Sequence, residues 1–210
     1  MLLVRKKFKI SKKIQAFYIF FVLITFGYVT VVHSSENNKL ISIGKEDAKI
    51  TVKVFSSLTC PHCAHFHGNV FKNLKRDFVD KGTVKFEHHG FPLDLAALNA
   101  EKILSCSNSI EKKLTFLNEL YEKQGIWAVG SDINSINSKL TKMAKNYGLD
   151  DDKVKDCLNN EELEEEILNN RINVHKKYKI ESTPTILINE KKYEGNHKYE
   201  SFKKVIEKLL

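Results

Sequence analysis

The feature that most constrains the fold is the sequence Cys60-Pro61-His62-Cys63, which lies between an apolar run and an amphipathic helical pattern. The apolar run, residues 50–55, predicts a strand, and the pattern after the cysteines predicts a helix. Proline is common at the first helical position, so the helix should begin at Pro61 with Cys60 as its N-cap. Two cysteines at this spacing at a helix start can close a disulfide bond and open it again.

The predicted helix start makes the two thiols unequal. Unpaired N–H groups and the positive end of the helix dipole stabilise a thiolate at the N-cap, so Cys60 is expected to be the nucleophile and Cys63 its buried partner. His62 adds a donor, which favours the thiolate further and makes the disulfide an oxidant. A structural disulfide and half of a zinc site are the alternatives. The strand before the motif and the helix after it favour the redox interpretation.

A second motif, Thr183-Pro184, stands before the apolar strand predicted at 185–189. Together with the dipeptide Pro61-His62 between the cysteines, it resembles the DsbA-type thiol:disulfide oxidoreductases of the thioredoxin-like superfamily. In such folds a proline at this place has a cis peptide bond and faces the active-site disulfide. The resemblance therefore implies that Thr183 and Pro184 bind substrate. A trans proline that only begins a strand is the alternative.

The predicted elements follow the order strand, motif, helix, strand, long helical segment, proline, hairpin and helix. This order and the resemblance predict an α/β protein with a thioredoxin-like fold that is interrupted by an inserted helical domain. The predicted parts are an export signal at 1–34, the first part of the thioredoxin-like domain at 35–90, the inserted helical domain at 91–178, and the second part of the thioredoxin-like domain at 179–210.

Apolar spacing also predicts which helical residues face the core of the insert. Leu95 is expected on a buried face of the first helix after residue 91. In the helix predicted over 161–178, the inward residues are expected to be Leu163, Ile167, Val174 and Tyr178.

The N-terminal segment carries most of the net charge of +8. Six basic residues precede the first acidic one, and the uncharged residues 14–32 follow them, a pattern that predicts an export signal. The signal is either cleaved near Ser34 or kept as an inner-membrane anchor. Both outcomes place the rest of a bacterial chain in the periplasm, where disulfides persist. The remaining charges nearly balance, so nucleic-acid binding is not expected. The six basic residues are Arg5, Lys6, Lys7, Lys9, Lys12 and Lys13.

Two further cysteines, Cys106 and Cys157, lie on apolar faces of helices predicted in the insert. An even number of cysteines in an oxidising compartment favours a structural disulfide between them. Some members of the family that the chain resembles also carry a second, non-catalytic disulfide. Two free cysteines in the core are the alternative.

One position departs from the pattern of thioredoxin-like proteins. Many of them place a buried carboxylate, which assists proton exchange with the second cysteine, where this sequence has Val54. Cys63 and His67 share a helical face, so with Cys60 they suggest a metal-binding or copper-handling module as an alternative of a different class. No metal and no other cofactor is expected for the redox function.

The sequence thus predicts an exported protein disulfide oxidoreductase that introduces disulfide bonds into translocated proteins. A reductase or isomerase on the same fold is the alternative. The resemblance implies two kinds of partner, reduced or unfolded exported proteins and a quinone-linked membrane reoxidant of the DsbB type. The short segment between the export signal and the first strand leaves no room for a dimerisation domain, so a monomer is expected.

Overall fold

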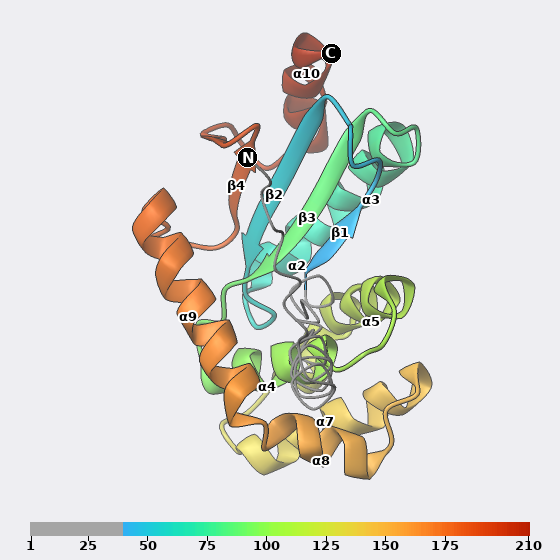
Figure 1. Ribbon diagram of the computed structural model, residues 1–210, viewed down its shortest axis with the longest axis vertical. Coiled ribbons are helices and arrows are strands. Elements are labelled where there is room, and N and C mark those ends of the chain that lie inside the picture. The colour runs from blue at the N-terminus through green and yellow to red at the C-terminus, as the bar shows by residue number, and fades with distance from the viewer. Residues whose placement is uncertain (1–39) are drawn as a thin grey trace, which may run out of the picture. The chain divides into compact units, whose positions relative to one another are not determined.

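A five-stranded sheet organises the computed structural model, which describes residues 40–210 and leaves the predicted export signal outside the described residues. The strand order is β1-β3-β2-β4-β5 (Figure 1). The central strand β2 (Ile50–Ser56) runs parallel to β3 (Val84–Gly90) and antiparallel to β4 (Thr185–Ile188). The short strands β1 (Ile41–Ile43) and β5 (Lys191–Lys192) pair with β3 and β4 at the two edges.

The register of β2 and β4 brings the two sequence motifs together. Phe55, near the end of β2, pairs with Thr185, the first residue of β4. Because the two strands are antiparallel, the loop that leaves β2 toward Cys60 and the segment that enters β4 through Pro184 lie at the same end of the sheet.

One continuous helical run follows the cysteine motif and covers a face of the sheet. It comprises α2 (Pro61–Phe66), the π-helical η2 (His67–Phe71), α3 (Lys72–Leu74) and the π-helical η3 (Lys75–Val79). The C-terminal helix α10 (Tyr199–Leu209) packs beside it. Their apolar side chains form one core with the strands, which includes Val52, Val54, Phe66, Val70, Phe71, Leu74, Phe86, Ile186, Phe202 and Ile206.

A helical insert lies between β3 and β4 (Figure 1). It has its own core around Trp127, whose indole Nε1 donates a hydrogen bond to the carbonyl oxygen of Leu120 at 2.7 Å. This core also contains Cys60 and Cys63, so the motif lies where the insert meets the sheet. The insert contains α4 (Leu95–Ser105), α5 (Ile110–Glu122), α6 (Gln124–Trp127), α7 (Ile133–Ala144), the 3₁₀ helix η4 (Lys145–Tyr147), α8 (Asp151–Leu158) and α9 (Glu161–Tyr178).

The structure contains most of the predicted strands and helices and adds one strand that was not predicted. Both long strands and the helix over 161–178 are confirmed, whereas β1 was not predicted because three residues are too few to show alternation. The predicted domain boundaries stay a prediction. No helix within residues 40–210 has both the length and the apolar character needed to cross a membrane.

Two predictions about buried residues are wrong or too strong. Leu95 is 55% exposed, because it occupies the first turn of α4 beside the cysteine loop. In α9 only Leu163 is fully buried, since the helix runs along the outside from the insert back to the sheet (Figure 1). Val174 and Tyr178 are half-buried and pack against a small cluster on the second face of the sheet.

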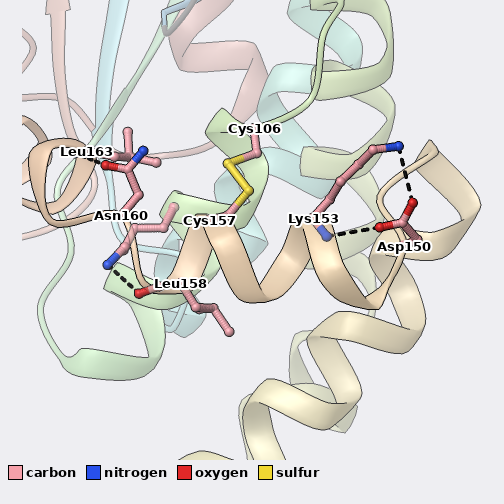
Figure 2. The surroundings of a disulfide bond; sticks show 8 residues. Cys106, Asp150, Lys153, Cys157, Leu158, Asn160 and Leu163 are labelled. Atoms are coloured by element: carbon pink, nitrogen blue, oxygen red, sulfur yellow. Dashed lines mark hydrogen bonds and ion pairs between the residues drawn. A yellow bond between two sulfur atoms is a disulfide. The ribbon is translucent and has the colours of Figure 1, made fainter.

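Cys106 and Cys157 form a disulfide bond with a Cα–Cα distance of 6.3 Å (Figure 2). The bond joins the end of α4 to α8, across 51 positions of the sequence. Beside it the buried Lys102 donates from Nζ to the carbonyl oxygen of Leu158 and to the carboxylate of Glu164, both at 2.7 Å. The disulfide and this lysine therefore hold α4, α8 and α9 together.

Candidate active site

The start of α2 is confirmed as predicted, with Cys60 as its N-cap and Pro61 as its first residue. Cys60 has extended backbone angles, φ −79° and ψ 119°, and its carbonyl oxygen accepts hydrogen bonds from the N–H groups of Cys63 and Ala64 at 3.0 and 3.2 Å. The N–H groups of this first turn are therefore available near the sulfur of Cys60. Cys60 is 9% exposed and Cys63 1%, so Cys60 is the more accessible thiol.

The environment of Cys63 suits a protonated thiol. Burial raises the pKa of Cys63 well above the ordinary value for a thiol, and the neighbouring Cys60 raises it further. Both cysteines are free in the structure. At neutral pH Cys63 therefore carries a proton, which it must lose before its sulfur can form a disulfide.

Thr183 is the residue of the second motif that contacts the cysteine motif. The Sγ atom of Cys60 donates a hydrogen bond to the carbonyl oxygen of Thr183 at 3.4 Å, across 123 positions of the sequence. The Thr183-Pro184 peptide bond is cis, as the resemblance implied, and Pro184 is buried. The structure thus brings Cys60, Thr183 and Pro184 together, while their role in substrate binding stays a prediction.

Gln124 is a buried residue of the site that the sequence did not reveal. Its Nε2 atom donates hydrogen bonds to the carbonyl oxygens of Leu58 at 2.8 Å and Cys60 at 3.1 Å. Gln124 is the first residue of α6, so these bonds connect the helical insert to the loop that carries the cysteines. No sequence pattern distinguishes this glutamine from a surface residue.

Asp94 makes a second connection between the loop and the insert. One oxygen of its carboxylate accepts a hydrogen bond from the N–H of Ala97 at 2.8 Å, as the N-cap of α4. The other oxygen accepts a hydrogen bond from the hydroxyl of Thr59 at 2.7 Å. The capping role has a sequence signal, an aspartate before an apolar helical pattern. The contact with Thr59 has none.

His62 and His67 have different surroundings. His62 is exposed and makes no hydrogen bond with Cys60 in the part of the chain that the structure describes, so its predicted donor role stays a prediction. His67 is buried, and its Nε2 is hydrogen-bonded to Oδ1 of Asn118 at 2.6 Å. Burial lowers the pKa of His67 to about 4, which keeps the ring neutral.

The geometry offers no counterpart to the alternative metal site. The alternative required Cys60, Cys63 and His67 to bind one ion together. Within residues 40–210 no three histidine, cysteine, aspartate or glutamate side chains are placed to hold a metal ion. His67 instead directs Nε2 to Asn118.

Several large apolar side chains are exposed on segments that contact the cysteine loop. Leu93, whose N–H donates to the hydroxyl of Ser57 at 3.4 Å, lies between β3 and α4, and Leu95 is the first residue of α4. Ile126 is 66% exposed in α6, the helix that begins at Gln124, and Val129 follows it. Apolar side chains gathered beside a reactive site are typical of a surface that binds another chain.

Comparisons with known proteins agree with this geometry. A family model described as thioredoxin matches residues 36–208. Disulfide bond formation protein D of Bacillus subtilis (strain 168) is 30% identical over 177 residues, or 80% of this chain and 76% of that protein. The crystal structure of alpha-DsbA1 from Wolbachia pipientis has a TM-score of 0.74 and 28% identity, covering 82% of this chain and 90% of that chain. The chain is a DsbA-type member of the thioredoxin family.

A second solved structure supports the same assignment for this DsbA-type chain. Oxidised BdbD from Bacillus subtilis has a TM-score of 0.72 and 26% identity, covering 81% of this chain and 92% of that chain. These likenesses confirm the predicted thioredoxin-like α/β fold with its helical insert.

The match to relatives from Rickettsia covers a smaller share of the relative than of this chain. A provisionally named protein-disulfide oxidoreductase of Rickettsia bellii (strain RML369-C) is 27% identical over 168 residues, or 80% of this DsbA-type chain. The match covers 63% of that relative, so the chain spans less than two thirds of its length.

Proposed function

We propose that this chain is an exported thiol:disulfide oxidoreductase that introduces disulfide bonds into translocated proteins through Cys60 and Cys63. One observation carries the proposal. The Cys60 sulfur lies at the start of a helix and within 3.4 Å of the Thr183 carbonyl oxygen, while Cys63 is buried behind it. A thiolate at Cys60 is stabilised by the helix start, and such stabilisation of the reduced form makes a disulfide oxidising.

The reaction balances as a thiol–disulfide exchange. A substrate thiolate attacks Cys60 of the oxidised chain, the Cys60–Cys63 bond breaks, and Cys63 leaves with the electron pair and takes up a proton. The second substrate thiol, as a thiolate, then attacks the mixed disulfide, and Cys60 leaves as a thiolate. The substrate has lost two electrons and the chain has gained them. Backbone groups at Thr183 and the exposed Leu93, Leu95 and Ile126 suit an extended, unfolded substrate.

The partners and the compartment are part of the same proposal. Substrates are reduced or unfolded exported proteins, and a quinone-linked membrane protein of the DsbB type reoxidises the chain. The six basic residues within 5–13 and the uncharged residues 14–32 support export to the periplasm. We expect the chain to act as a monomer.

The test is the direction of exchange. The oxidised full chain is mixed with a peptide that carries two thiols, and the free thiols of both are counted. We expect one disulfide to appear in the peptide for each chain reduced, and an equilibrium with glutathione that favours the reduced chain. A chain that stays oxidised at equilibrium with glutathione, and whose reduced form opens the disulfide of the oxidised peptide, acts as a reductase, which contradicts the proposal.

Two variants serve as controls for this experiment. Cys60→Ser should abolish transfer, because the attacked sulfur is absent. The double variant Cys106→Ala/Cys157→Ala should still transfer its disulfide, because that bond lies at the far end of α4. Transfer by Cys60→Ser at the parent rate would assign the activity to other cysteines.

A further inference from the structure

The turn between β4 and β5 places a glutamate where glycine is favoured. Its two residues, Asn189 and Glu190, have φ values of 48° and 65°, in the left-handed region. Ile188 and Lys191 pair across the turn, and two-residue hairpin loops of this kind favour Asn-Gly. Asparagine tolerates the left-handed region, and Oδ1 of Asn189 accepts a hydrogen bond from the N–H of Thr51 at 2.8 Å. Glutamate has no such tolerance, and strained backbone of this kind is typical of positions with a functional constraint.

The carboxylate of Glu190 contacts both β2 and the end of α9. Its Oε1 atom lies 2.5 Å from Nζ of Lys53 in β2. Its Oε2 atom accepts a hydrogen bond from the hydroxyl of Tyr178 at 2.6 Å and lies 4.0 Å from Nζ of Lys177. The hydrogen bonds from Lys53 and Tyr178 lower the pKa of Glu190, so the carboxylate is charged at neutral pH. Glycine at this position would favour the turn but would remove all three contacts.

Tyr178 is the last residue of α9, and its ring packs against the sheet. The ring lies 5.4 Å from the ring of Phe55, near the end of β2, in the cluster on the second face of the sheet. Nζ of Lys192 in β5 donates to the carbonyl oxygen of Lys179, the residue after the helix, at 3.5 Å. The hairpin therefore contacts the end of α9 twice, once through Tyr178 and once through Lys179.

The chain leads from this contact directly to the carbonyl group beside the reactive sulfur. Lys179 has a φ of 50° and turns the chain out of α9. Ile180 is 1% exposed, and its carbonyl oxygen accepts a hydrogen bond from Nδ1 of His175 at 2.6 Å. Only two residues then separate Ile180 from Thr183, whose carbonyl oxygen accepts the hydrogen bond from Cys60. The end of α9 thus fixes the start of a very short segment that carries this carbonyl group.

Strand β4 fixes the other end of the same segment. The hydroxyl of Thr185, the first residue of β4, donates to the carbonyl oxygen of Ser182 at 2.7 Å. Thr185 also pairs with Phe55, whose ring packs on Tyr178. Both ends of the segment are therefore held against the same part of β2, and a shift of Tyr178 changes the orientation of the Thr183 carbonyl group.

We propose that Glu190 and Tyr178 are positioning residues that hold the Thr183 carbonyl group in the orientation that binds the backbone of a substrate. The substrate is an extended peptide, and one of its N–H groups donates to this carbonyl oxygen. Glu190 and Tyr178 do not touch the substrate but act through the segment that ends at Thr183. The inference rests on the proposed function and names the residues that serve its substrate-binding segment.

The experiment measures disulfide transfer from the oxidised full chain to a peptide with two thiols, over a range of peptide concentrations. Tyr178→Phe removes only the hydroxyl, and Glu190→Gly removes the carboxylate while it favours the turn. We expect the half-saturating peptide concentration to rise about fivefold in each variant, and the maximal rate to change by less than about twofold. The double variant should bind the peptide no more weakly than the weaker single variant, since both changes remove one contact.

Urea unfolding separates this role from simple support of the fold. Glu190→Ala keeps a strained turn and also loses the carboxylate, so it should unfold at a lower urea concentration than Glu190→Gly. Both variants should lose peptide binding to the same extent. If Glu190→Gly binds the peptide as the parent does, the carboxylate supports only the fold and the inference is wrong. A lower maximal rate at the parent's half-saturating concentration indicates a disturbed cysteine loop and overturns the inference as well.

Matched controls come from a second tyrosine–glutamate pair, in the insert. The hydroxyl of Tyr147 donates to Glu119 at 2.5 Å, so Tyr147→Phe and Glu119→Ala make the same chemical changes elsewhere. Both should bind the peptide as the parent does. Equal weakening in these controls, or an unchanged half-saturating concentration in Tyr178→Phe, overturns the inference while the proposed function stands. If the parent transfers no disulfide to the peptide, the proposed function fails and the positioning role fails with it.

Discussion

Gln124 donates a hydrogen bond from Nε2 to the carbonyl oxygen of Cys60, the same oxygen that accepts the first backbone hydrogen bonds of α2. A side chain of the insert thus fixes the turn on which the reactive sulfur is carried. The thioredoxin-like part supplies the cysteines, and the insert determines how their loop is held.

Replacing Gln124 should loosen the cysteine loop. Gln124→Ala removes two hydrogen bonds to buried carbonyl oxygens, so the free energy of unfolding should fall by about 2 kcal/mol. Disulfide exchange at Cys60 should also become slower. Urea unfolding and stopped-flow reduction measure the two effects. Lys123→Ala, at the neighbouring position with a surface ion pair to Glu119, should change stability by less than about 0.5 kcal/mol. Equal effects of the two variants would contradict the role given to Gln124.

The two functions of Asp94 can be separated by comparison with another cap. Asp94→Ala and Asp150→Ala each remove a helix N-cap and should each lower the unfolding free energy by about 1 kcal/mol. Only Asp94 also binds Thr59, so only its loss should change the rate of exchange at Cys60. Asp94→Asn keeps one oxygen to accept from the N–H of Ala97, and its amide group can donate to the Thr59 hydroxyl, so this variant should restore most of that rate. Unfolding curves and exchange rates of the three variants provide the check, and a rate change with Asp150→Ala would argue against it.

The disulfide between Cys106 and Cys157 should contribute to stability without taking part in exchange. It closes a loop across 51 positions, so its loss in Cys106→Ala/Cys157→Ala should lower the unfolding free energy by an amount on the order of 4 kcal/mol. Disulfide transfer at moderate temperature should be retained. Asp156→Ala, an exposed neighbour on α8, serves as the control and should leave the unfolding curve unchanged. A double variant as stable as the parent would show that the bond adds nothing to the fold.

His67 should make the free energy of unfolding depend on pH. Its pKa is about 4 in the folded chain and near 6.5 when unfolded, so the unfolded chain binds more protons between these values. The free energy of unfolding should therefore be highest above pH 6.5 and decline as the pH falls to 4, by at most about 3 kcal/mol. His67→Gln should flatten this slope, whereas His65→Gln, at an exposed position, should not. Urea midpoints across pH 4–7 measure the slope, and an unchanged slope in His67→Gln would assign it to other groups.

The two thiols should differ in their reaction with iodoacetamide. In the reduced parent chain at mildly acidic pH, Cys60 should be alkylated first, because it is the more accessible thiol and lies at the helix start. In Cys60→Ser, labelling of Cys63 should remain slow at pH 7 and increase only at alkaline pH, since burial raises its pKa. Mass spectrometry of the labelled peptides distinguishes the sites. Preferential labelling of Cys63 in the parent would reverse the two roles.

Local signals in the sequence were sufficient for much of the fold. Pro61 marks the start of α2, apolar alternation marks β2 and β3, and Asp150 marks the cap of α8, because each signal depends on residues within one or two helical turns. The motifs at Cys60 and Thr183 carried the resemblance to the DsbA-type family. Their meeting follows from the antiparallel pairing of β2 with β4.

Only the tertiary structure decided which side chains surround the cysteines. Gln124 and Tyr121 are ordinary helix residues in the sequence, and nothing in their spacing indicates a site. Gln124 binds the carbonyl oxygen of Cys60 across 64 positions, and Tyr121 belongs to the same buried cluster as Cys63, because the insert folds back against the end of the sheet. Such contacts depend on the packing of whole helices and on strand register, so no local pattern encodes them. The sequence by itself determined the reactive motif and the elements that carry it, whereas packing between distant segments determined its electrostatic environment.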